Sequence, residues 1–283
     1  MARTAYVDGR YRPLAEAGVS VEDRGFQFAD AIYEVWAVRG GRLLDMDGHL
    51  ARLKRSLGEI RVRAPMTDAA LVAVLEETRR RNRVRDGIVY LQISRGAAPR
   101  DHAFPSPEVK PTLVITAKPL DRRAFEARAE AGVKIITLPD ERWARCDIKT
   151  VSLLPNVLAK QKAREAGAFE AWLVDDEGFV TEGTSSNAWI VDAQGRLRTR
   201  DLSNAILHGV TRAAVKKLAE ERQMIVLEQA FTLAEARDAK EAFLTSAANA
   251  VMPIVAIDGA SIGKGKPGAI ARVLRAVYFG AEG

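Results

Sequence analysis

The segment Glu141–Asn156 reads ERWARCDIKTVSLLPN and contains two residues that compete for chemistry. Cys146 is the only cysteine of the chain, and Lys149 follows it closely. Lys149 leaves a strand-like stretch and enters an apolar one, whereas most other lysines lie on polar helix faces. A partly desolvated lysine amine can form a Schiff base with a carbonyl compound. The pattern therefore makes Lys149 a candidate nucleophile.

Cys146 is the weaker of the two candidates. It lies between Arg145, which would lower the pKa of the thiol, and Asp147, which would raise it. No histidine is near in sequence, and a lone cysteine is more often inert packing than a nucleophile. A single cysteine also excludes an internal disulfide framework and is typical of a reducing compartment.

The composition is that of a folded globular protein. With 283 residues, 47% of them hydrophobic, the chain can bury one large core or two medium ones. No apolar run approaches the roughly 20 residues that a membrane helix needs, and the N-terminal segment lacks an apolar secretory region. We therefore expect a cytoplasmic protein with no membrane partner. Its net charge of +6 suits small anionic substrates.

Two other classes of site are disfavoured. The densest cationic cluster, RRRNRVR at 79–85, lacks the interleaved aromatic residues of a nucleic-acid site. We interpret it as a solvated helix end, and keep an anion- or nucleic-acid-binding protein as an alternative of a different class. The histidines His49, His102 and His208 show no metal-ligand spacing, so no metal is expected.

The pattern of apolar residues predicts mixed helices and strands. Turns at Asp8-Gly9 and Gly40-Gly41 predict two hairpins. Leucines at 50, 53 and 57 predict an amphipathic helix, and Thr67 can cap the next one. Further predicted elements are strands within 87–95, 112–118, 133–138, 170–174, 187–191, 224–228 and 241–246, and helices over about 155–166, 210–223, 233–239 and from about Pro267.

The order of these elements predicts an α+β (mixed α/β) fold in two domains. We expect a smaller N-terminal domain over 1–118 and a larger C-terminal, cofactor-binding domain over 133–283. Residues 119–132, PLDRRAFEARAEAG, are charged and weakly apolar and are predicted to form a linker. A Rossmann fold is disfavoured because the chain has no GxGxxG motif and no clean βαβ alternation.

Four further segments carry polar residues suited to binding. Glu182 begins a Gly/Ser/Thr-rich loop that could hold an anion. Thr211 starts a helix and could bind phosphate or merely cap the helix, and Ser246 ends a strand that could form a second phosphate wall. Arg100 and His102 lie on a loop and could clamp a carboxylate. Alone, each is also an ordinary polar turn or surface loop; together with Lys149 they suit pyridoxal phosphate held as a Schiff base.

Seven motifs then resemble those of the class IV, fold-type IV pyridoxal phosphate aminotransferases. They follow in order from about residue 3 to about residue 275: EDRGFQFADAIYEV, GHLARLKRS, SRGAAPRDHAFP, RWARCDIKTVSLLPNVLAKQKA, TEGTSSN, LHGVTR and FLTS. Within the family, RCDIK and PRxH are similar to the D-amino acid (D-alanine) aminotransferases. The resemblance implies two domains with the cofactor between them.

The resemblance also implies a role for each candidate residue. Lys149 matches the lysine that holds the cofactor and carries the proton, and Glu182 matches the carboxylate that pairs with the pyridine nitrogen. The implied cofactor contacts are Arg52, Val210, Thr211 and Ser246 at the phosphate and Leu207 at the ring. The substrate carboxylate is implied to meet Tyr33, Arg100 and His102, the last two from a partner subunit, so a homodimer is implied.

Two positions depart from the family pattern. Ala247 replaces a hydroxyl residue of the phosphate wall, which removes a hydrogen bond worth about 1 kcal/mol. Ala37 stands where the best-known relatives carry a lysine near the substrate pocket. The second departure bears on side-chain preference and not on the reaction.

The implied reaction is a ping-pong transamination in which a D-amino acid such as D-alanine and 2-oxoglutarate give pyruvate and D-glutamate. Within the family, a branched-chain L-amino acid aminotransferase or a 4-amino-4-deoxychorismate lyase would use Lys149 and Glu182 in the same way. The PRDH segment favours the D-amino acid enzyme. An R-selective amine aminotransferase would not need the carboxylate clamp of Arg100 and His102.

Overall fold

The computed structural model describes residues 3–280 and divides into two compact units. Unit 1 comprises Met1–Asp121 with Ile148–Ser152, and unit 2 comprises Arg122–Asp147 with Leu153–Gly283. The first division lies three residues beyond the boundary predicted at 118. The short segment Ile148–Ser152, which the sequence placed in the larger domain, groups with unit 1 instead.

The predicted linker over 119–132 is mostly a helix of unit 2. Helix α4 spans Arg122–Ala131, with Ala129 buried and Phe125 packed against the unit 2 core. Residues four apart lie on the same helix face, so these two side chains form a narrow apolar stripe. The charged residues around this stripe make the segment look like a linker in the sequence.

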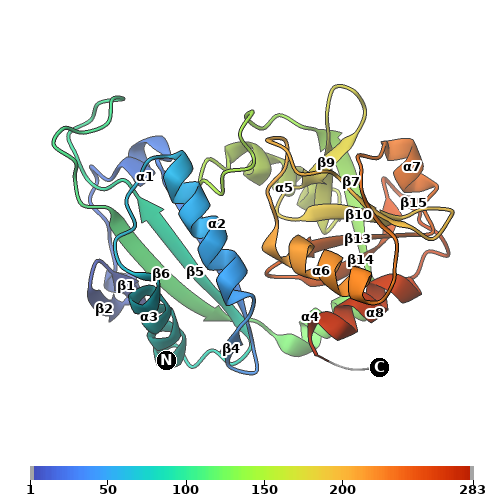
Figure 1. The fold of residues 1–283 in the computed structure, drawn as a ribbon, viewed down its shortest axis with the longest axis horizontal. Helices are drawn as coiled ribbons and strands as arrows, with labels where there is room; N and C mark the ends of the chain where they lie inside the picture. Colours follow the sequence, from blue (N-terminus) through green and yellow to red (C-terminus); the bar gives the residue numbers. More distant parts are fainter. Residues whose placement is uncertain (1–2, 281–283) are drawn as a thin grey trace. The chain divides into compact units, whose positions relative to one another are not determined.

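Unit 1 is a six-stranded antiparallel sheet with helices packed against one face (Figure 1). The strand order is β2-β1-β6-β5-β3-β4. The strands are β1 (Thr4–Val7), β2 (Arg10–Pro13), β3 (Ala31–Arg39), β4 (Arg42–Leu43), β5 (Gly87–Ser94) and β6 (Thr112–Pro119). The helices are η1 (Leu14–Glu16), α1 (Arg24–Phe28), α2 (Met46–Glu59) and α3 (Asp68–Arg81).

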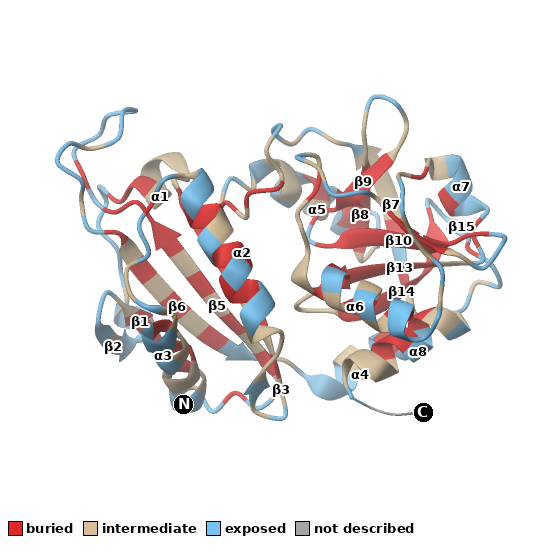
Figure 2. Cartoon of the chain, in the orientation of Figure 1, coloured by how far each residue is buried: buried red, intermediate tan, exposed pale blue. Residues whose placement is uncertain are grey.

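The core of unit 1 follows from strand and helix periodicity. Buried and less buried residues alternate along β5 and β6 (Figure 2), because successive strand side chains point to opposite faces. Leu53 and Leu57 of α2 pack on the buried face beside Trp36. The two predicted hairpins and the α2 helix are confirmed, and Thr67 caps α3 by accepting a hydrogen bond from the N–H of Ala70.

Unit 2 contains a nine-stranded mixed sheet with the path β12-β11-β10-β13-β14-β7-β8-β9, and β15 pairs with β14. The strands are β7 (Val133–Pro139), β8 (Glu170–Val174), β9 (Val180–Gly183), β10 (Asn187–Val191), β11 (Leu197–Thr199), β12 (Val226–Glu228), β13 (Glu241–Ser246), β14 (Ala250–Ile257) and β15 (Ala260–Ser261). The helices, besides α4, are α5 (Leu154–Glu165), α6 (Val210–Glu221), α7 (Leu233–Arg237) and α8 (Ala269–Tyr278).

This sheet is buried on both faces. One apolar cluster contains Ile190 with Ala129 and Ala236 from α4 and α7. A second cluster contains Trp189 with helices α6 and α8. Because neighbouring strand residues point to opposite faces, Trp189 and Ile190 place the two clusters on opposite sides. Double burial explains why every residue of β14 is buried and why its sequence does not alternate.

The segment Ile148–Ser152 adds a short pairing to the edge of β3. The N–H of Tyr33 donates to the carbonyl of Lys149 at 2.9 Å, and the N–H of Val151 donates to the carbonyl of Ala31 at 3.1 Å. We call this segment the lysine strap. Among the helices of residues 3–280, none is both long enough and apolar enough to cross a membrane.

Candidate active site

The lysine strap places Lys149 beside Tyr33 in unit 1. The Lys149 Nζ atom lies 4.1 Å from the centroid of the Tyr33 ring, a distance suited to a cation–π contact. The backbone N–H of Lys149 donates to Ser56 Oγ on α2 at 3.3 Å. Two residues predicted to share the site are therefore in contact, and the backbone of the lysine is fixed from β3 and from α2.

Arg52, predicted to bind a phosphate, belongs to a buried charge cluster. Its Nε and Nη2 atoms donate to the two oxygens of Glu34 at 2.7 and 2.8 Å. The Nδ1 atom of His49 lies 2.8 Å from Glu34 Oε2. The Glu34 carboxylate is fully buried, so it is held by charge-assisted hydrogen bonds instead of water. Glu34 thereby fixes the direction of the Arg52 guanidinium; phosphate binding by Arg52 stays a prediction.

The charge state of this cluster follows from its contacts. Burial alone would raise the pKa of Glu34, but the charge and hydrogen bonds of Arg52, the hydrogen bond of His49 and the charge of Lys149 lower it to about 2. Burial lowers the pKa of His49 more than Glu34 raises it. A neutral His49 beside an ionised carboxylate must therefore carry its proton on Nδ1 and donate it to Glu34.

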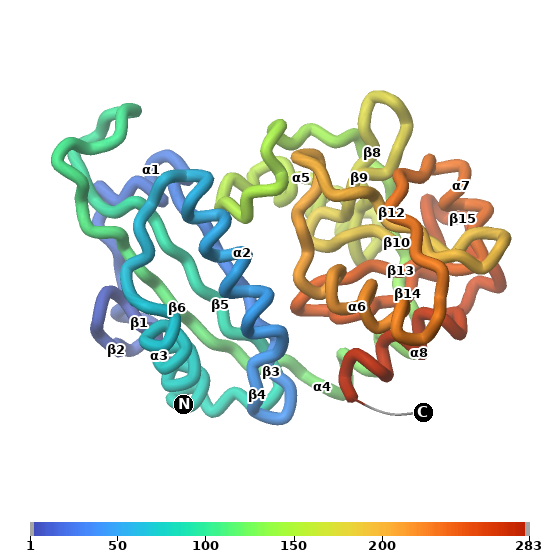
Figure 3. The backbone as a smooth tube through the Cα atoms, in the orientation of Figure 1, coloured from blue at the N-terminus to red at the C-terminus, as the bar shows by residue number. Residues whose placement is uncertain are grey.

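Arg100 and His102 lie together on the loop that joins β5 to β6 (Figure 3). The Arg100 Cζ atom is 4.5 Å from the centroid of the Phe28 ring, and the His102 and Phe28 ring centroids are 5.3 Å apart. Within residues 3–280, no hydrogen bond or ring contact joins this pair to Tyr33 or Lys149. The structure thus groups Arg100 with His102, and groups Tyr33 with Lys149.

Glu182 in unit 2 is a buried carboxylate with several donors. It ends β9, is 5% exposed, and forms an ion pair with Arg142. The N–H of Leu207 donates to Glu182 Oε1 at 3.1 Å, and Asn187 Nδ2 donates to Oε2 at 3.0 Å. The backbone of Leu207 is thus in direct contact with Glu182, whereas the predicted packing of its side chain on the cofactor ring stays a prediction.

Arg142 is itself buried and doubly paired. It bonds to both oxygens of Asp140 and donates to the carbonyl of Ala205 at 3.0 Å. Burial alone would lower the pKa of Arg142, but the hydrogen bond to Asp140 and the charge of Glu182 raise it well above its ordinary value. A permanent cation therefore stands beside Glu182 and favours its ionised form.

The start of α6 has the features of a phosphate site. Gly209 precedes the helix, Val210 begins it, and the first N–H groups of a helix have no partner within the helix. The hydroxyl of Thr211 is buried and has no hydrogen-bond partner among the described residues. A Cβ at Gly209 would lie 1.9 Å from Asn187 Oδ1, so only glycine fits there. An incoming phosphate would satisfy both the free N–H groups and the orphan hydroxyl.

Ser246 ends β13, the strand that pairs with β10, where Asn187 lies. Its hydroxyl accepts hydrogen bonds from the N–H of Asn249 at 3.2 Å and from Asn249 Nδ2 at 3.1 Å. Asn187 also donates to the carbonyl of Leu207 at 2.9 Å. One side chain therefore ties Glu182 to the segment that leads into α6. Phosphate binding by Val210, Thr211 and Ser246 stays a prediction, which these groups fit.

The rival nucleophile has no sign of activation. Burial raises the pKa of the Cys146 thiol to about 11, and its Sγ donates to the carbonyl of Trp143 at 3.1 Å. A thiol with a raised pKa is a poor nucleophile at neutral pH. Within the described part of the chain, no cluster of histidine, cysteine or acidic residues could hold a metal ion.

Comparison with known proteins decides the family. A family model described as amino-transferase class IV matches residues 31–257. The chain belongs to the class IV aminotransferases. Pyridoxal phosphate is the cofactor of this family, and the predicted family, enzyme class and cofactor are confirmed.

The sequence of this class IV aminotransferase is 42% identical over 265 residues to a D-alanine aminotransferase of Bacillus licheniformis, covering 94% of this chain and 92% of that one. It is 39% identical over 271 residues to a D-alanine aminotransferase of Staphylococcus haemolyticus, covering 95% and 94%.

Solved structures confirm the fold of this class IV aminotransferase. A branched-chain amino acid aminotransferase from T.th., in a structure with pyridoxamine 5'-phosphate, aligns with a TM-score of 0.90 at 26% identity, covering 100% of this chain and 96% of that one. The branched-chain enzyme of Escherichia coli aligns with a TM-score of 0.89 at 22% identity, covering 99% and 94%, and shows the fold alone. The predicted two-domain, fold-type IV architecture is therefore confirmed.

Proposed function

We propose that this enzyme transfers the amino group of a D-amino acid, such as D-alanine, to a 2-oxo acid, such as 2-oxoglutarate. The observation that carries this proposal is the pairing of buried Glu182 with the permanent cation Arg142. A carboxylate kept ionised is what a protonated pyridine nitrogen needs as a partner. Identity of 42% to a D-alanine aminotransferase, against 26% to a branched-chain enzyme, supports the choice of D-amino acids.

Pyridoxal phosphate, when bound, supplies an electron sink for the electron pair left at the substrate Cα. Lys149 Nζ would accept the Cα proton as a neutral amine and hold it for return. Glu182 would keep the proton on the pyridine nitrogen by charge pairing. Arg52, the start of α6 and Ser246 would bind the phosphate, with Arg52 held in direction by Glu34.

Arg100, His102 and Tyr33 would bind the substrate carboxylate. Fixing the carboxylate decides which hydrogen of Cα faces the base, and so decides which enantiomer reacts. We further propose that the enzyme is a homodimer in which Arg100 and His102 serve the partner's site. Their grouping on Phe28, away from contact with Tyr33, supports this. A cytoplasmic location is proposed from the single free thiol of Cys146.

Branched-chain L-amino acid transamination is the second candidate, favoured by the structural alignment to branched-chain enzymes. A donor screen with 2-oxoglutarate separates the two. We expect D-alanine to react and L-leucine to be poor. Reaction with L-leucine alone would overturn the assignment to D-amino acids.

The role of Lys149 is tested by Lys149→Ala, with Lys162→Ala on the exposed face of α5 as the matched control. We expect at least about a thousandfold loss of activity for the first variant and none for the second, because the first removes both the nucleophile and the base. Borohydride treatment of the wild type should fix the cofactor mass on Lys149. Wild-type turnover by Lys149→Ala would disprove the mechanism.

A further inference from the structure

Arg24 fastens the backbone of the loop that carries Arg100 and His102. It begins α1 and is 3% exposed. Its guanidinium donates to the carbonyl of Asp101 and, at 3.2 Å, to the carbonyl of His102. Asp101 is the residue between the two predicted clamp residues. The Arg24 backbone N–H also donates to the carbonyl of Gly96 at 2.9 Å, where the loop begins.

Asp30 holds Arg24 and Arg95 side by side. Its Oδ2 atom accepts from Arg24 Nε at 2.8 Å and from Arg95 Nε at 2.7 Å, and its Oδ1 accepts from Arg95 Nη2 at 2.9 Å. Burial alone would raise the pKa of Asp30, but hydrogen bonds from Arg95 and Arg24 lower it. The carboxylate therefore stays ionised between two guanidinium groups.

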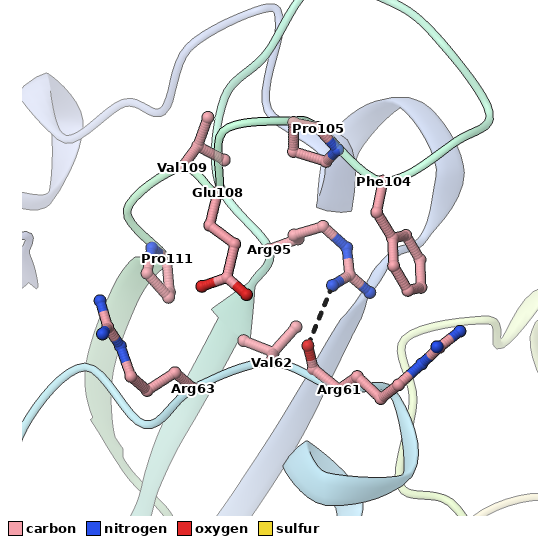
Figure 4. Close-up of a pocket in the computed structure, with 9 residues that line it drawn as sticks. All are labelled: Arg61, Val62, Arg63, Arg95, Phe104, Pro105, Glu108, Val109 and Pro111. Carbon is pink, nitrogen blue, oxygen red and sulfur yellow. Dashed lines mark hydrogen bonds between the residues drawn. The ribbon is translucent and has the colours of Figure 1, made fainter.

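Arg95 fixes the later part of the same loop. Its guanidinium donates to the carbonyls of Ile60 and Arg61 at 2.8 and 3.2 Å. It also lies 3.6 Å from the centroid of the Phe104 ring, and Figure 4 shows the two side chains against each other in the wall of a pocket. The loop is thus held at its start, at the clamp and after the clamp by two arginines that share Asp30.

The arrangement directs side chains as well as backbone. Arg24 itself lies 4.8 Å from the centroid of the Phe28 ring, the same ring that Arg100 and His102 contact. Nε, Nη1 and Nη2 of Arg24 each meet a different acceptor, and a planar guanidinium can satisfy all three at once in only one orientation. A lysine could keep the charge but not this geometry.

We propose that Arg24, oriented by Asp30, is a positioning residue that sets the direction of Arg100 and His102 and thereby the affinity for substrate carboxylates. This rests on the proposed function. Arg24 acts through the loop backbone, so its removal should weaken carboxylate binding without removing any group that performs the chemistry. The steady-state constants should therefore separate, with KM changing more than kcat.

The test uses Arg24→Lys in the purified holoenzyme. We expect KM for D-alanine and for 2-oxoglutarate to rise at least about tenfold, since small displacements of a positioning group cost this much or more. We expect kcat, and the slow turnover of a primary amine that lacks a carboxylate, to change less than KM. The dissociation constant of propionate, measured by calorimetry, should rise with the same factor and needs no turnover.

Arg198→Lys is the matched control, because Arg198 is also a buried arginine that bonds a carboxylate, Glu235, and a carbonyl, that of Ala230. It should lower the melting temperature and leave KM and propionate affinity unchanged. Should Arg24→Lys fail to fold, Asp30→Asn releases the same arginine at constant side-chain volume and should raise KM in the same way.

Unchanged KM and propionate affinity in a folded Arg24→Lys or Asp30→Asn variant would overturn the inference. Equal losses with carboxylate substrates and with the simple amine would also overturn it, because they would indicate general damage. A wild type that transaminates no amino acid would count against the proposed function instead. In that case propionate affinity, compared between wild type and variant, still decides the role of Arg24.

Discussion

The two units bury a carboxylate in opposite ways. Glu34 in unit 1 and Glu170 in unit 2 are both fully inaccessible to water. Glu34 is surrounded by cationic or basic side chains, Arg52 and His49. Glu170 accepts from Thr184 Oγ1 at 2.6 Å, from Ser186 Oγ at 3.0 Å, and from both the N–H and the hydroxyl of Ser185.

The difference matches what each carboxylate holds in place. Glu34 orients a guanidinium, which needs an opposite charge in a site without water. Glu170 orients a loop of neutral groups that leads from Glu182 to Asn187, and hydroxyls and N–H groups suffice for this. The turn is tight, since a Cβ at Gly183 would lie 2.4 Å from Ser186 Oγ. Unit 1 thus uses charge to aim a cation, and unit 2 uses uncharged donors to shape a turn.

The largest effect should come from Glu34→Gln. This change leaves Arg52 buried without its counter-charge, which typically costs about 3–5 kcal/mol of unfolding free energy. Denaturant unfolding measures the loss. The control is Glu77→Gln, which removes an exposed ion pair with Arg80 and should change stability little. Equal losses in the two variants would show that charge pairing at Glu34 has no special weight.

Glu170→Gln should cost less, about 1–3 kcal/mol. The amide keeps one acceptor, and the hydroxyls of Thr184 and Ser185 can rotate to accept from its NH₂ group. The same unfolding measurement checks this value. A loss as large as that of Glu34→Gln would end the distinction between the two kinds of burial.

The smallest effect is a change in acid sensitivity. The pKa of Glu34 is about 2 in the folded protein, against an ordinary value of 4.5. Its contribution to stability is therefore complete above pH 4.5 and is lost as the pH falls from 4.5 toward 2, where the unfolded state binds the proton first. In Glu34→Gln the slope of stability against pH in this window should decrease by up to about 1.4 kcal/mol per pH unit. An unchanged slope would contradict the lowered pKa.

Much of the fold could be predicted because local patterns agree with it. The Asp8-Gly9 turn, the leucine spacing of α2 and the cap at Thr67 are local features. Helix α4 escapes prediction because its apolar stripe consists of little more than Phe125 and Ala129. The doubly buried β14 does not alternate and escapes prediction as well.

The residues around the site were harder to find. Glu34 left a signal, since it occupies the same strand face as Ile32 and Trp36, where a carboxylate must find a partner. Arg142 left none: nothing in its spacing separates it from Arg145, whose side chain is more exposed. Its pairing with Glu182 depends on contacts across 40 residues of sequence.

The lysine strap has a consequence for how the chain reaches its folded form. The edge of β3 at Ala31–Tyr33 is completed only by residues near 150, so more than a hundred residues separate the partners of that pairing. Closing so long a loop is slow compared with forming the hairpins of the same unit. A fragment that ends at Asp121 would contain every strand of unit 1 but would leave this edge open to pairing with other chains. The segment that carries the reactive amine therefore also protects the nascent protein from aggregation once it docks.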